Sequence, residues 1–197
     1  MGEMIKMVVV LTVLSVISGG GLKGLEEWAK PKIENNVMNL VKGPAIRQML
    51  GDAENDPVED RFKVADGEKE RNVFVGVFNG KANTIVLESS ANGYGGPIGL
   101  VVAINTEEEK LAGIGVTTHT ETPGLGGEAK ANPAFAAQFV GKAVTAPIQV
   151  TNDGGAISAL SGATITSRAV CKGTRKAIET YNKLKPQLEE KIKGLGK

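Results

Sequence analysis

A long apolar segment near the N-terminus constrains this chain more than any other feature. From Met7 to Leu25 the sequence MVVVLTVLSVISGGGLKGL contains a single charged residue, Lys23. As a helix rising ~1.5 Å per residue, this stretch reaches about 28 Å, close to the hydrocarbon thickness of a bilayer. Because it is apolar around its whole circumference, a buried helix of a soluble domain is disfavoured. We therefore predict a transmembrane anchor over residues 1–26.

A cleaved signal peptide is the alternative interpretation of this run. Small residues follow it in SVISGGG, as they do before a cleavage site, but no A-x-A pattern is present. Its hydroxyl side chains can bond carbonyls of their own helix, and Lys23 can reach the headgroups. A retained span is favoured, although the lysine bias around it is too small to orient it.

Composition limits the chemistry of the remaining chain. The formal net charge is +1 and aromatic residues make up 4%, so neither a phosphate-tracking surface nor a base-stacking platform is expected, and nucleic acid is excluded as a partner. One cysteine, Cys171, and one histidine, His119, cannot form an internal disulfide or a Cys/His zinc cluster. Redox chemistry would therefore need an organic cofactor or a partner protein.

Two flanking regions surround a predicted central domain over residues 61–185. In the helical linker region, residues 27–60, we expect a helix broken by Pro31, a second helix closing near Leu50, and an acidic surface loop. The tail, residues 186–197, has the composition of a solvated helical end.

The central domain begins with strand patterns. Two runs rich in β-branched and aromatic residues meet at Asn79-Gly80, which favours a tight hairpin. Further strands are predicted over residues 98–106 and 111–120. The predicted fold class is therefore α+β, an antiparallel sheet packed with helices and preceded by one N-terminal transmembrane helix.

Helices are expected after the sheet. Asn132 and Pro133 mark the start of a helix over PAFAAQFVGK, and a short strand, APIQVT, should follow. A second helix is predicted from Thr164 to about Leu184. Its packing face is expected to consist mostly of small residues, namely Ile165, Ala169, Cys171, Gly173, Ala177, Ile178 and Tyr181.

The sequence Ser161-Gly162-Ala163-Thr164 stands at the start of that second helix. Unpaired N–H groups and the positive end of the macrodipole make a helix N-terminus a ready phosphate site. Gly162 and Ala163 leave the backbone accessible, and Thr164 presents a hydroxyl there. For the tetrapeptide alone, an ordinary helix cap is the favoured explanation. A hydrolase nucleophile is disfavoured because the G-x-S-x-G elbow is missing.

Two further glycine-rich stretches are unusual. In HTETPGLGGEAK, His119 to Lys130, the turn at Pro123-Gly124 would leave Glu121 and Thr122 exposed at the end of the sheet. The other stretch is NGYGGPIG, residues 92–99. Taken alone, each is equally well explained as a plain loop between strands.

These three stretches, in this order after an N-terminal span, resemble the FMN-binding domain of the G subunit of the Rnf electron-transport complex. The homologous C subunit of the sodium-pumping NADH:quinone reductase shares that domain. The resemblance implies that Thr164 carries FMN through a phosphoester bond. It also implies that a separate flavin transferase makes this bond from FAD with magnesium, so that the threonine needs no resident base.

The same resemblance assigns cofactor-binding residues. Ser161, Gly162 and Ala163 match the attachment motif, and residues 121–126 match the family's ETPGLG. We expect Thr122, Gly124 and Leu125 to line the isoalloxazine and Glu121 to bond nearby. Tyr94, Gly95 and Gly96 are further candidates, and no metal ligands or catalytic residues are expected.

One departure from the family pattern stands close to the attachment motif. Many such motifs carry an aspartate six residues before the threonine, where this chain has Ser158. Asp153 lies five residues further upstream and would need a rearranged loop to substitute for it.

The function implied is a membrane-anchored electron carrier with covalent FMN, the G subunit of an ion-translocating Rnf ferredoxin:NAD⁺ oxidoreductase. It would be an electron-transfer subunit and no complete enzyme. Its partners would be the membrane subunits, a second flavin-carrying subunit, the flavin transferase and the lipid bilayer. We expect a single pass through the cytoplasmic (inner) membrane, with the soluble domain on the extracytoplasmic side. No nicotinamide fingerprint is present.

Three alternatives remain open. The chain could be the C subunit of a sodium-translocating NADH:quinone reductase, a non-redox anchored scaffold, or a free-standing extracellular flavoprotein. His119 is interpreted as a structural residue at a strand end, and Cys171 as a small buried residue of the second helix.

Overall fold

A computed structural model of the protein describes residues 2–67 and 69–194. The chain divides into two compact units, Met1–Leu40 and Val41–Lys197.

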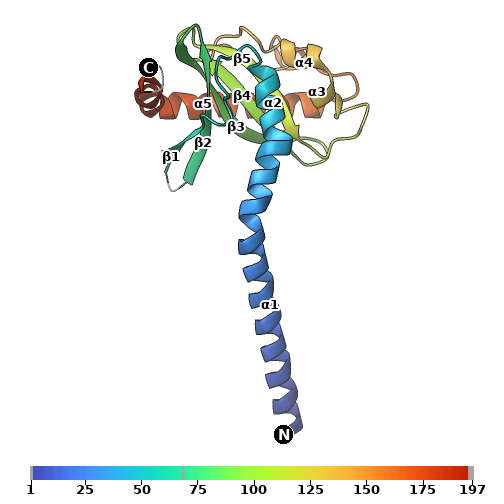
Figure 1. The fold of residues 1–197 in the computed structure, drawn as a ribbon. Helices are drawn as coiled ribbons and strands as arrows, with labels where there is room; N and C mark the ends of the chain where they lie inside the picture. The colour runs from blue at the N-terminus through green and yellow to red at the C-terminus, as the bar shows by residue number, and fades with distance from the viewer. Residues whose placement is uncertain (1, 68, 195–197) are drawn as a thin grey trace. The chain divides into compact units, whose positions relative to one another are not determined.

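The first unit consists mainly of α1, Gly2–Val37 (Figure 1). Its large apolar side chains are exposed from Met4 to Ile33. By length and composition, one helix in the described residues is apolar enough to cross a membrane, a test that a signal sequence also passes. The predicted break at Pro31 is wrong, because α1 continues through this residue. Proline removes one helical hydrogen bond, but Ala29, Lys30 and Lys32 around it favour the helix.

The irregularity in this helical region comes after α1. A π-helix, η1, covers Met38–Lys42 and is followed by α2, Gly43–Met49. The second predicted helix was expected to close near Leu50, and α2 ends one residue before it.

The second unit is built on a five-stranded antiparallel sheet in the order β1-β2-β3-β4-β5 (Figure 1). The hairpin between β2 and β3 turns at Asn79 and Gly80, whose φ angles of 55° and 71° are those of a tight hairpin turn. The predicted antiparallel sheet is confirmed. Its strands are β1 Phe62–Asp66, β2 Lys69–Phe78, β3 Lys81–Asn92, β4 Pro97–Asn105 and β5 Lys110–Thr118.

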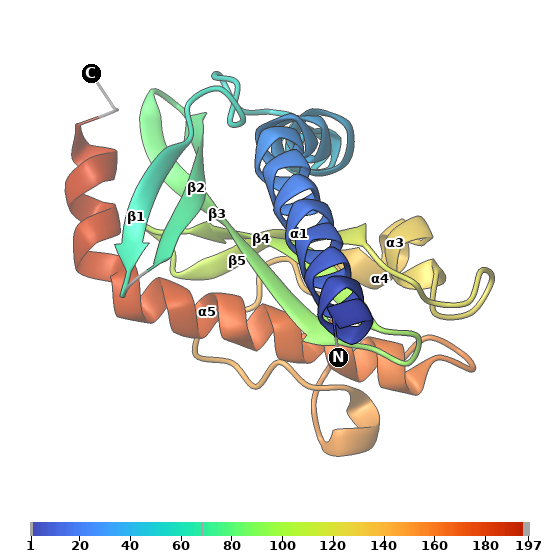
Figure 2. The ribbon, with the colours of Figure 1, turned by 90° about the horizontal axis from the view of Figure 1, so that it is seen from below.

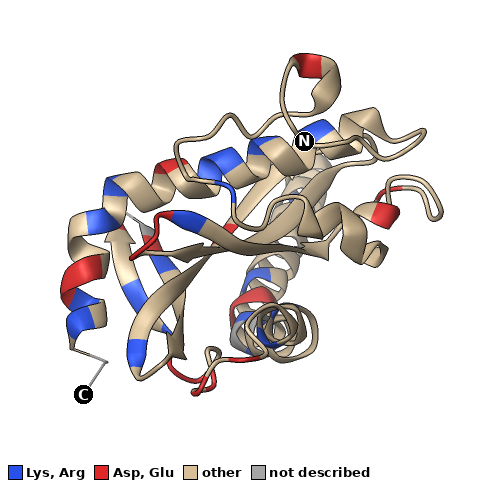
Figure 3. Cartoon of the chain, turned by 90° about the horizontal axis from the view of Figure 1, so that it is seen from above, with Lys and Arg blue, Asp and Glu red and all other residues tan. Residues whose placement is uncertain are grey.

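The long helix α5, Thr164–Lys193, lies along one face of this sheet (Figure 2). A Cβ atom added to Gly173 would collide with Leu100 of β4, and the Gly173 carbonyl accepts a hydrogen bond of 2.8 Å from Ser89 of β3. The small residue therefore lets the helix backbone approach the sheet closely. Lys and Arg recur along α5 (Figure 3).

The other face of the sheet is covered by α2. A Cβ atom on Gly115 of β5 would lie 3.1 Å from Val101 and 3.7 Å from Ala45 of α2. Val101 and Leu100 are neighbours in β4, so they point to opposite faces. Both are buried, which explains why β4 is apolar at consecutive residues.

Short helices and turns connect β5 to α5. They are α3 Glu128–Ala131, α4 Pro133–Ala137 and the 3-10 helix η2 Thr151–Asp153. The predicted cap of α4 is present, since Asn132 Oδ1 accepts a hydrogen bond of 3.0 Å from the N–H of Ala134. The helix is shorter than predicted, and the chain turns at Gly141, whose φ is 77°.

The strand predicted over residues 146–151 does not form. Val150 makes one isolated parallel bridge with Ile157. Pro147 has no N–H to donate to a ladder, and no named strand pairs with this segment.

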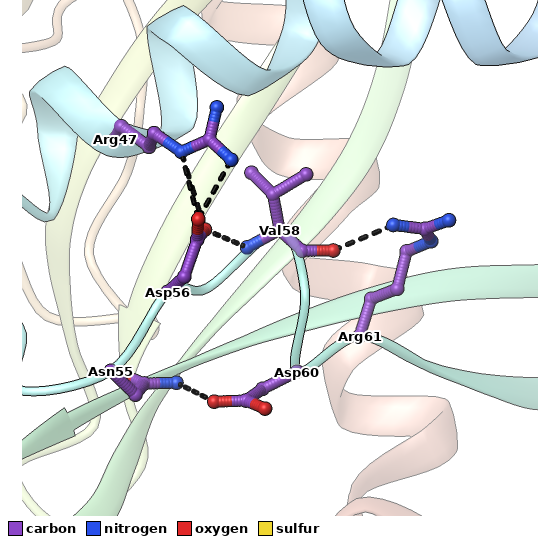
Figure 4. A network of polar contacts seen from close by, with 6 residues as sticks. All are labelled: Arg47, Asn55, Asp56, Val58, Asp60 and Arg61. Carbon is purple, nitrogen blue, oxygen red and sulfur yellow. Dashed lines mark hydrogen bonds and ion pairs between the residues drawn. The ribbon is translucent and has the colours of Figure 1, made fainter.

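Polar contacts, including one from α2, hold the acidic segment over residues 55–61 in place before β1 (Figure 4). Arg47 of α2 holds Asp56 through its Nε atom at 3.2 Å and its Nη2 atom at 2.7 Å. Asp56 in turn accepts a bond of 2.9 Å from the N–H of Val58, whose carbonyl accepts one of 2.7 Å from Arg61. Hydrogen bonding from Arg47 is the main cause that lowers the pKa of Asp56.

The C-terminal part of α5 belongs to the packed unit. Leu184, Leu188 and Ile192 are buried at spacings of four residues, which places them on one side of the helix. The boundary expected at residue 185 falls inside this helix. Ile165, expected on the packing face, is half exposed because it lies in the first turn of α5.

This packing predicts the effect of two neighbouring substitutions. Leu188→Ala should lower the free energy of unfolding of the full chain by about 2–5 kcal/mol, because it leaves a cavity. Gln187→Ala, at an exposed residue, should change it by less than about 0.5 kcal/mol. Urea titrations followed by circular dichroism in detergent measure both. Equal stabilities of the two variants would contradict the packing role of this segment.

Candidate functional site: a cavity between three glycine-rich segments

Three segments far apart in the sequence enclose a cavity of about 500 Å³, a volume typical of small-molecule sites. They are the β3–β4 loop, the chain after β5, and the start of α5. The lining residues are Tyr94, Glu121, Thr122, Leu125, Gly126, Gly162, Ala163, Thr164, Ile165 and Thr166.

The glycines of the β3–β4 loop allow it to lie against the segment after β5. A Cβ atom on Gly95 would collide with the carbonyl oxygen of Thr120, and the Thr120 hydroxyl donates a bond of 2.9 Å to the Gly95 carbonyl. Gly96 has a φ of 145°, which other residues rarely adopt. The loop therefore depends on glycine for both conformation and contact.

Glu121 connects all three segments through its carboxylate. It is only 5% exposed and accepts hydrogen bonds from the N–H of Gly95 at 2.7 Å and from that of Tyr94 at 3.3 Å. The hydroxyl of Thr166 on α5 donates to the same carboxylate. Burial raises the pKa of Glu121, but these hydrogen bonds together lower it below its ordinary value.

The N-terminus of α5 opens into the cavity. No side chain caps it, and the N–H groups of its first turn have no partner within the helix. Gly162, just before it, has a φ of 69°. The half-buried Thr164 is the first helical residue and lines the cavity. This end of the helix can therefore bind an anionic group beside the Thr164 hydroxyl.

Apolar side chains surround the cavity. Within the described part of the second unit, four large apolar side chains are exposed, and three of them line the cavity: Tyr94, Leu125 and Ile165, at 76%, 46% and 50% exposure. Scattered exposed apolar residues are ordinary, but such a concentration around one cavity marks a binding surface. The arrangement suits a ligand with an apolar aromatic part and an anionic group.

The residues expected at the site mostly meet here. Seven of them line the cavity, namely Tyr94, Glu121, Thr122, Leu125, Gly162, Ala163 and Thr164, whereas Ser161, Gly95, Gly96 and Gly124 do not. Gly95 still contributes through its N–H bond to Glu121.

Three lining residues, Gly126, Ile165 and Thr166, were not among the expected cofactor-binding residues, although Gly126 belongs to the ETPGLG match. The sequence could have indicated that Thr166 is buried. It lies three positions before Ala169, a residue of the predicted packing face of α5, and so falls on the same side of the helix. Such a buried hydroxyl needs a partner.

The lone histidine and the lone cysteine have structural surroundings. His119 Nδ1 accepts a bond of 3.3 Å from the N–H of Glu121. Cys171 is buried, and burial raises the pKa of its thiol to about 11. Among the described residues, no group of three or more His, Cys, Asp or Glu side chains is arranged to hold a metal ion.

Ser158 and Asp153 both lie outside the cavity lining. The Gln138 side chain binds the backbone of Ser158, accepting from its N–H at 2.7 Å and donating to its carbonyl at 3.3 Å. Asp153 accepts two bonds from Arg168 of α5, at 2.8 and 2.7 Å. Asp153 therefore pairs with a residue of α5 that lies one helical turn after Thr164.

Comparison with known proteins gives this fold and cavity a class. Residues 93–179, which include all three segments, match the model of the FMN-binding domain family. The second unit thus contains a match to the FMN-binding domain that includes the cavity.

Longer similarities extend beyond this domain. The chain is 33% identical over 171 residues to the G subunit of the proton-translocating ferredoxin:NAD(+) oxidoreductase complex of Clostridium ljungdahlii, covering 86% of each chain. It is 28% identical over 193 residues to the G subunit of the ion-translocating oxidoreductase complex of Pseudomonas aeruginosa, covering 91% of this chain and 89% of that one. The chain belongs to this family of G subunits, as the sequence motifs indicated.

The fold has a counterpart among solved structures. The C subunit of the Na(+)-translocating NADH-quinone reductase from Parabacteroides distasonis superposes with a TM-score of 0.51 at 22% identity, over 63% of this chain and 76% of that one. This likeness confirms the predicted α+β fold.

Two adjacent glycines test the contacts around Glu121. A Cβ atom on Gly126 would lie 2.7 Å from both Glu121 Oε2 and Thr166 Oγ1, whereas one on Gly127 meets nothing closer than 3.4 Å. Gly126→Ala should therefore lower the free energy of unfolding by about 1–3 kcal/mol. Gly127→Ala should change it much less. Thermal unfolding of both variants measures the difference, and a stable Gly126→Ala would contradict the contacts described.

Proposed function

We propose that this chain carries electrons as the G subunit of an ion-translocating ferredoxin:NAD⁺ oxidoreductase (Rnf) complex, with FMN joined to the Thr164 hydroxyl by a phosphoester bond. One observation carries the proposal. The uncapped N-terminus of α5, the Thr164 hydroxyl and an exposed apolar rim meet at a single cavity. FMN combines a phosphate with a flat, largely apolar ring system.

The residues of the cavity fit both parts of FMN. The N–H groups of the first turn of α5 would bind the phosphate, because they have no partner within the helix. Tyr94, Leu125 and Ile165 would cover the ring and keep water from it, since their apolar surfaces are otherwise exposed. Glu121 holds the two loops and the helix together around the ligand.

When bound, FMN supplies one- and two-electron transfer, and the protein supplies binding, orientation and electrostatics. No general base for Thr164 is found among the lining residues, because the Glu121 carboxylate is already occupied by three donors. We therefore propose that a separate flavin transferase modifies Thr164 with FAD as donor. The pyrophosphate bond of FAD breaks, the bond from Thr164 Oγ1 to the flavin phosphate forms, and AMP and a proton leave.

Membrane attachment and partners complete the proposal. The exposed apolar surface of α1 supports a single span in the cytoplasmic (inner) membrane. The names of the G-subunit relatives support assembly with other Rnf subunits, including the membrane subunits and a second flavin-carrying subunit. We place the FMN-binding domain on the extracytoplasmic side, where a covalent bond would prevent loss of the flavin. The similarity to the C subunit of the quinone reductase is weaker in identity and supports the fold alone.

Substitution of Thr164 tests the covalent bond. When the full chain is coexpressed with a flavin transferase, a fluorescent band should survive SDS denaturation, and Thr164→Ala should abolish it. Thr180→Ala should retain the band, because Thr180 lies on the same helix outside the cavity and bonds the Lys176 carbonyl at 2.8 Å. Peptide mass mapping locates the modification. A dark wild-type chain would contradict the proposal, as would a fluorescent Thr164→Ala variant.

Labelling of an introduced cysteine tests the sidedness. The single native cysteine is buried, so Asn152→Cys, at an exposed residue, provides one reactive thiol. A membrane-impermeant maleimide should label it in intact spheroplasts, whereas the unsubstituted chain should remain unlabelled. Labelling that requires permeabilised cells would place the domain on the cytoplasmic side.

A further inference from the structure

We infer that Glu121 is the fixed negative charge of the flavin cavity and holds the reduction potential of the bound flavin low. This inference rests on the proposed function, because it concerns FMN in the cavity described above. Among the ten lining residues, all in the described part of the chain, Glu121 is the one side chain that is charged near neutral pH. No positively charged side chain in the lining therefore offsets the effect of its charge on the ligand.

The hydrogen bonds of Glu121 favour its ionised form. A buried carboxylate is unfavourable unless donors surround it, and here two backbone N–H groups and one hydroxyl donate to it. In the described residues, no Lys or Arg lies within 4.0 Å of this carboxylate. Hydrogen-bond dipoles therefore stabilise the charge, together with electrostatic attraction from the neighbouring His119, and among the described residues no Lys or Arg forms an ion pair with it.

A fixed negative charge changes the redox behaviour of a nearby flavin in one direction. Each electron added to the flavin is repelled by the carboxylate, and burial strengthens this repulsion because the local dielectric constant is low. The oxidised form is therefore stabilised relative to the reduced form. Charge near the flavin ring is one of the means by which proteins tune this cofactor.

The positive end of α5 does not cancel this effect. Its macrodipole corresponds to about half an elementary charge, and the flavin phosphate bound there would be negative in both redox states. The positive helix end and the negative phosphate therefore offset each other's charge to the same extent whether the flavin is oxidised or reduced. The charge on Glu121 lacks such a partner in the cavity.

A purely structural role for Glu121 would give different results, and two substitutions separate the roles. Glu121→Gln keeps the size and an acceptor for the Gly95 N–H, while Thr166 can turn its hydroxyl to accept from the amide. It removes the charge. Thr166→Val keeps the shape and the charge, but removes a donor whose dipole partly offsets the carboxylate. A structural role predicts similar effects of both, whereas an electrostatic role predicts opposite shifts of potential.

The experiment is a spectroelectrochemical titration of the flavin in the full-length loaded chain, in detergent at pH 8. Glu121→Gln should raise the ratio of reduced to oxidised FMN at a given applied potential at least tenfold, which corresponds to a positive shift of about 30 mV for a two-electron couple. Thr166→Val should shift the potential to a more negative value. Glu128→Gln removes the same charge from a residue that does not line the cavity, and should leave the potential unchanged.

The outcomes distinguish the inference from the function on which it rests. Loading is measured first, by flavin absorbance of the wild-type chain; a chain that takes up no flavin overturns both. With normal loading, an unchanged or negative shift in Glu121→Gln overturns the inference alone. If Glu121→Gln does not fold, the sign of the Thr166→Val shift decides. A negative shift supports the inference, and an unchanged or positive one overturns it.

Discussion

The hydrogen-bonded carboxylate of Glu121 is the interaction on which the cavity depends. The β3–β4 loop, the segment after β5 and the first turn of α5 share no strand ladder, and Glu121 accepts a hydrogen bond from both of the others. Gly126 must lack a side chain because a Cβ atom would lie against this contact. The glycine-rich character of the segments thus follows from the close approach that one buried carboxylate requires.

The sequence predicted the features that depend on local interactions. Asn79-Gly80 determines the hairpin between β2 and β3 because these residues adopt positive φ angles readily. Asn132 likewise caps α4 with its own side chain. The three cavity segments were assigned to one site through their resemblance to the FMN-binding domain, because each segment alone was at least as well explained as a cap or a plain loop. Thr166 was missed because its role depends on Glu121, forty-five residues away in the sequence.

Two further errors also have nonlocal causes. Residues 146–151 have the composition of a strand but make no ladder, because the sheet ends at β5 and Val150 bridges only to Ile157. The end of α5 looks polar in composition, yet Leu188 and Ile192 are buried. Burial at every fourth residue was hidden among charged neighbours, and only the packing of the second unit reveals it.

Exposed apolar surface occurs in two separate parts of this chain, and no other part of the described chain covers either of them. Along α1 it continues around the helix over a length that matches a bilayer. At the cavity it is confined to three side chains beside an uncapped helix end and a buried carboxylate. A lipid surface would cover the first, and a flavin would fill the second. The carboxylate that assembles the cavity also places a negative charge within it, so the same contact that shapes the site would set the electrochemistry of its ligand.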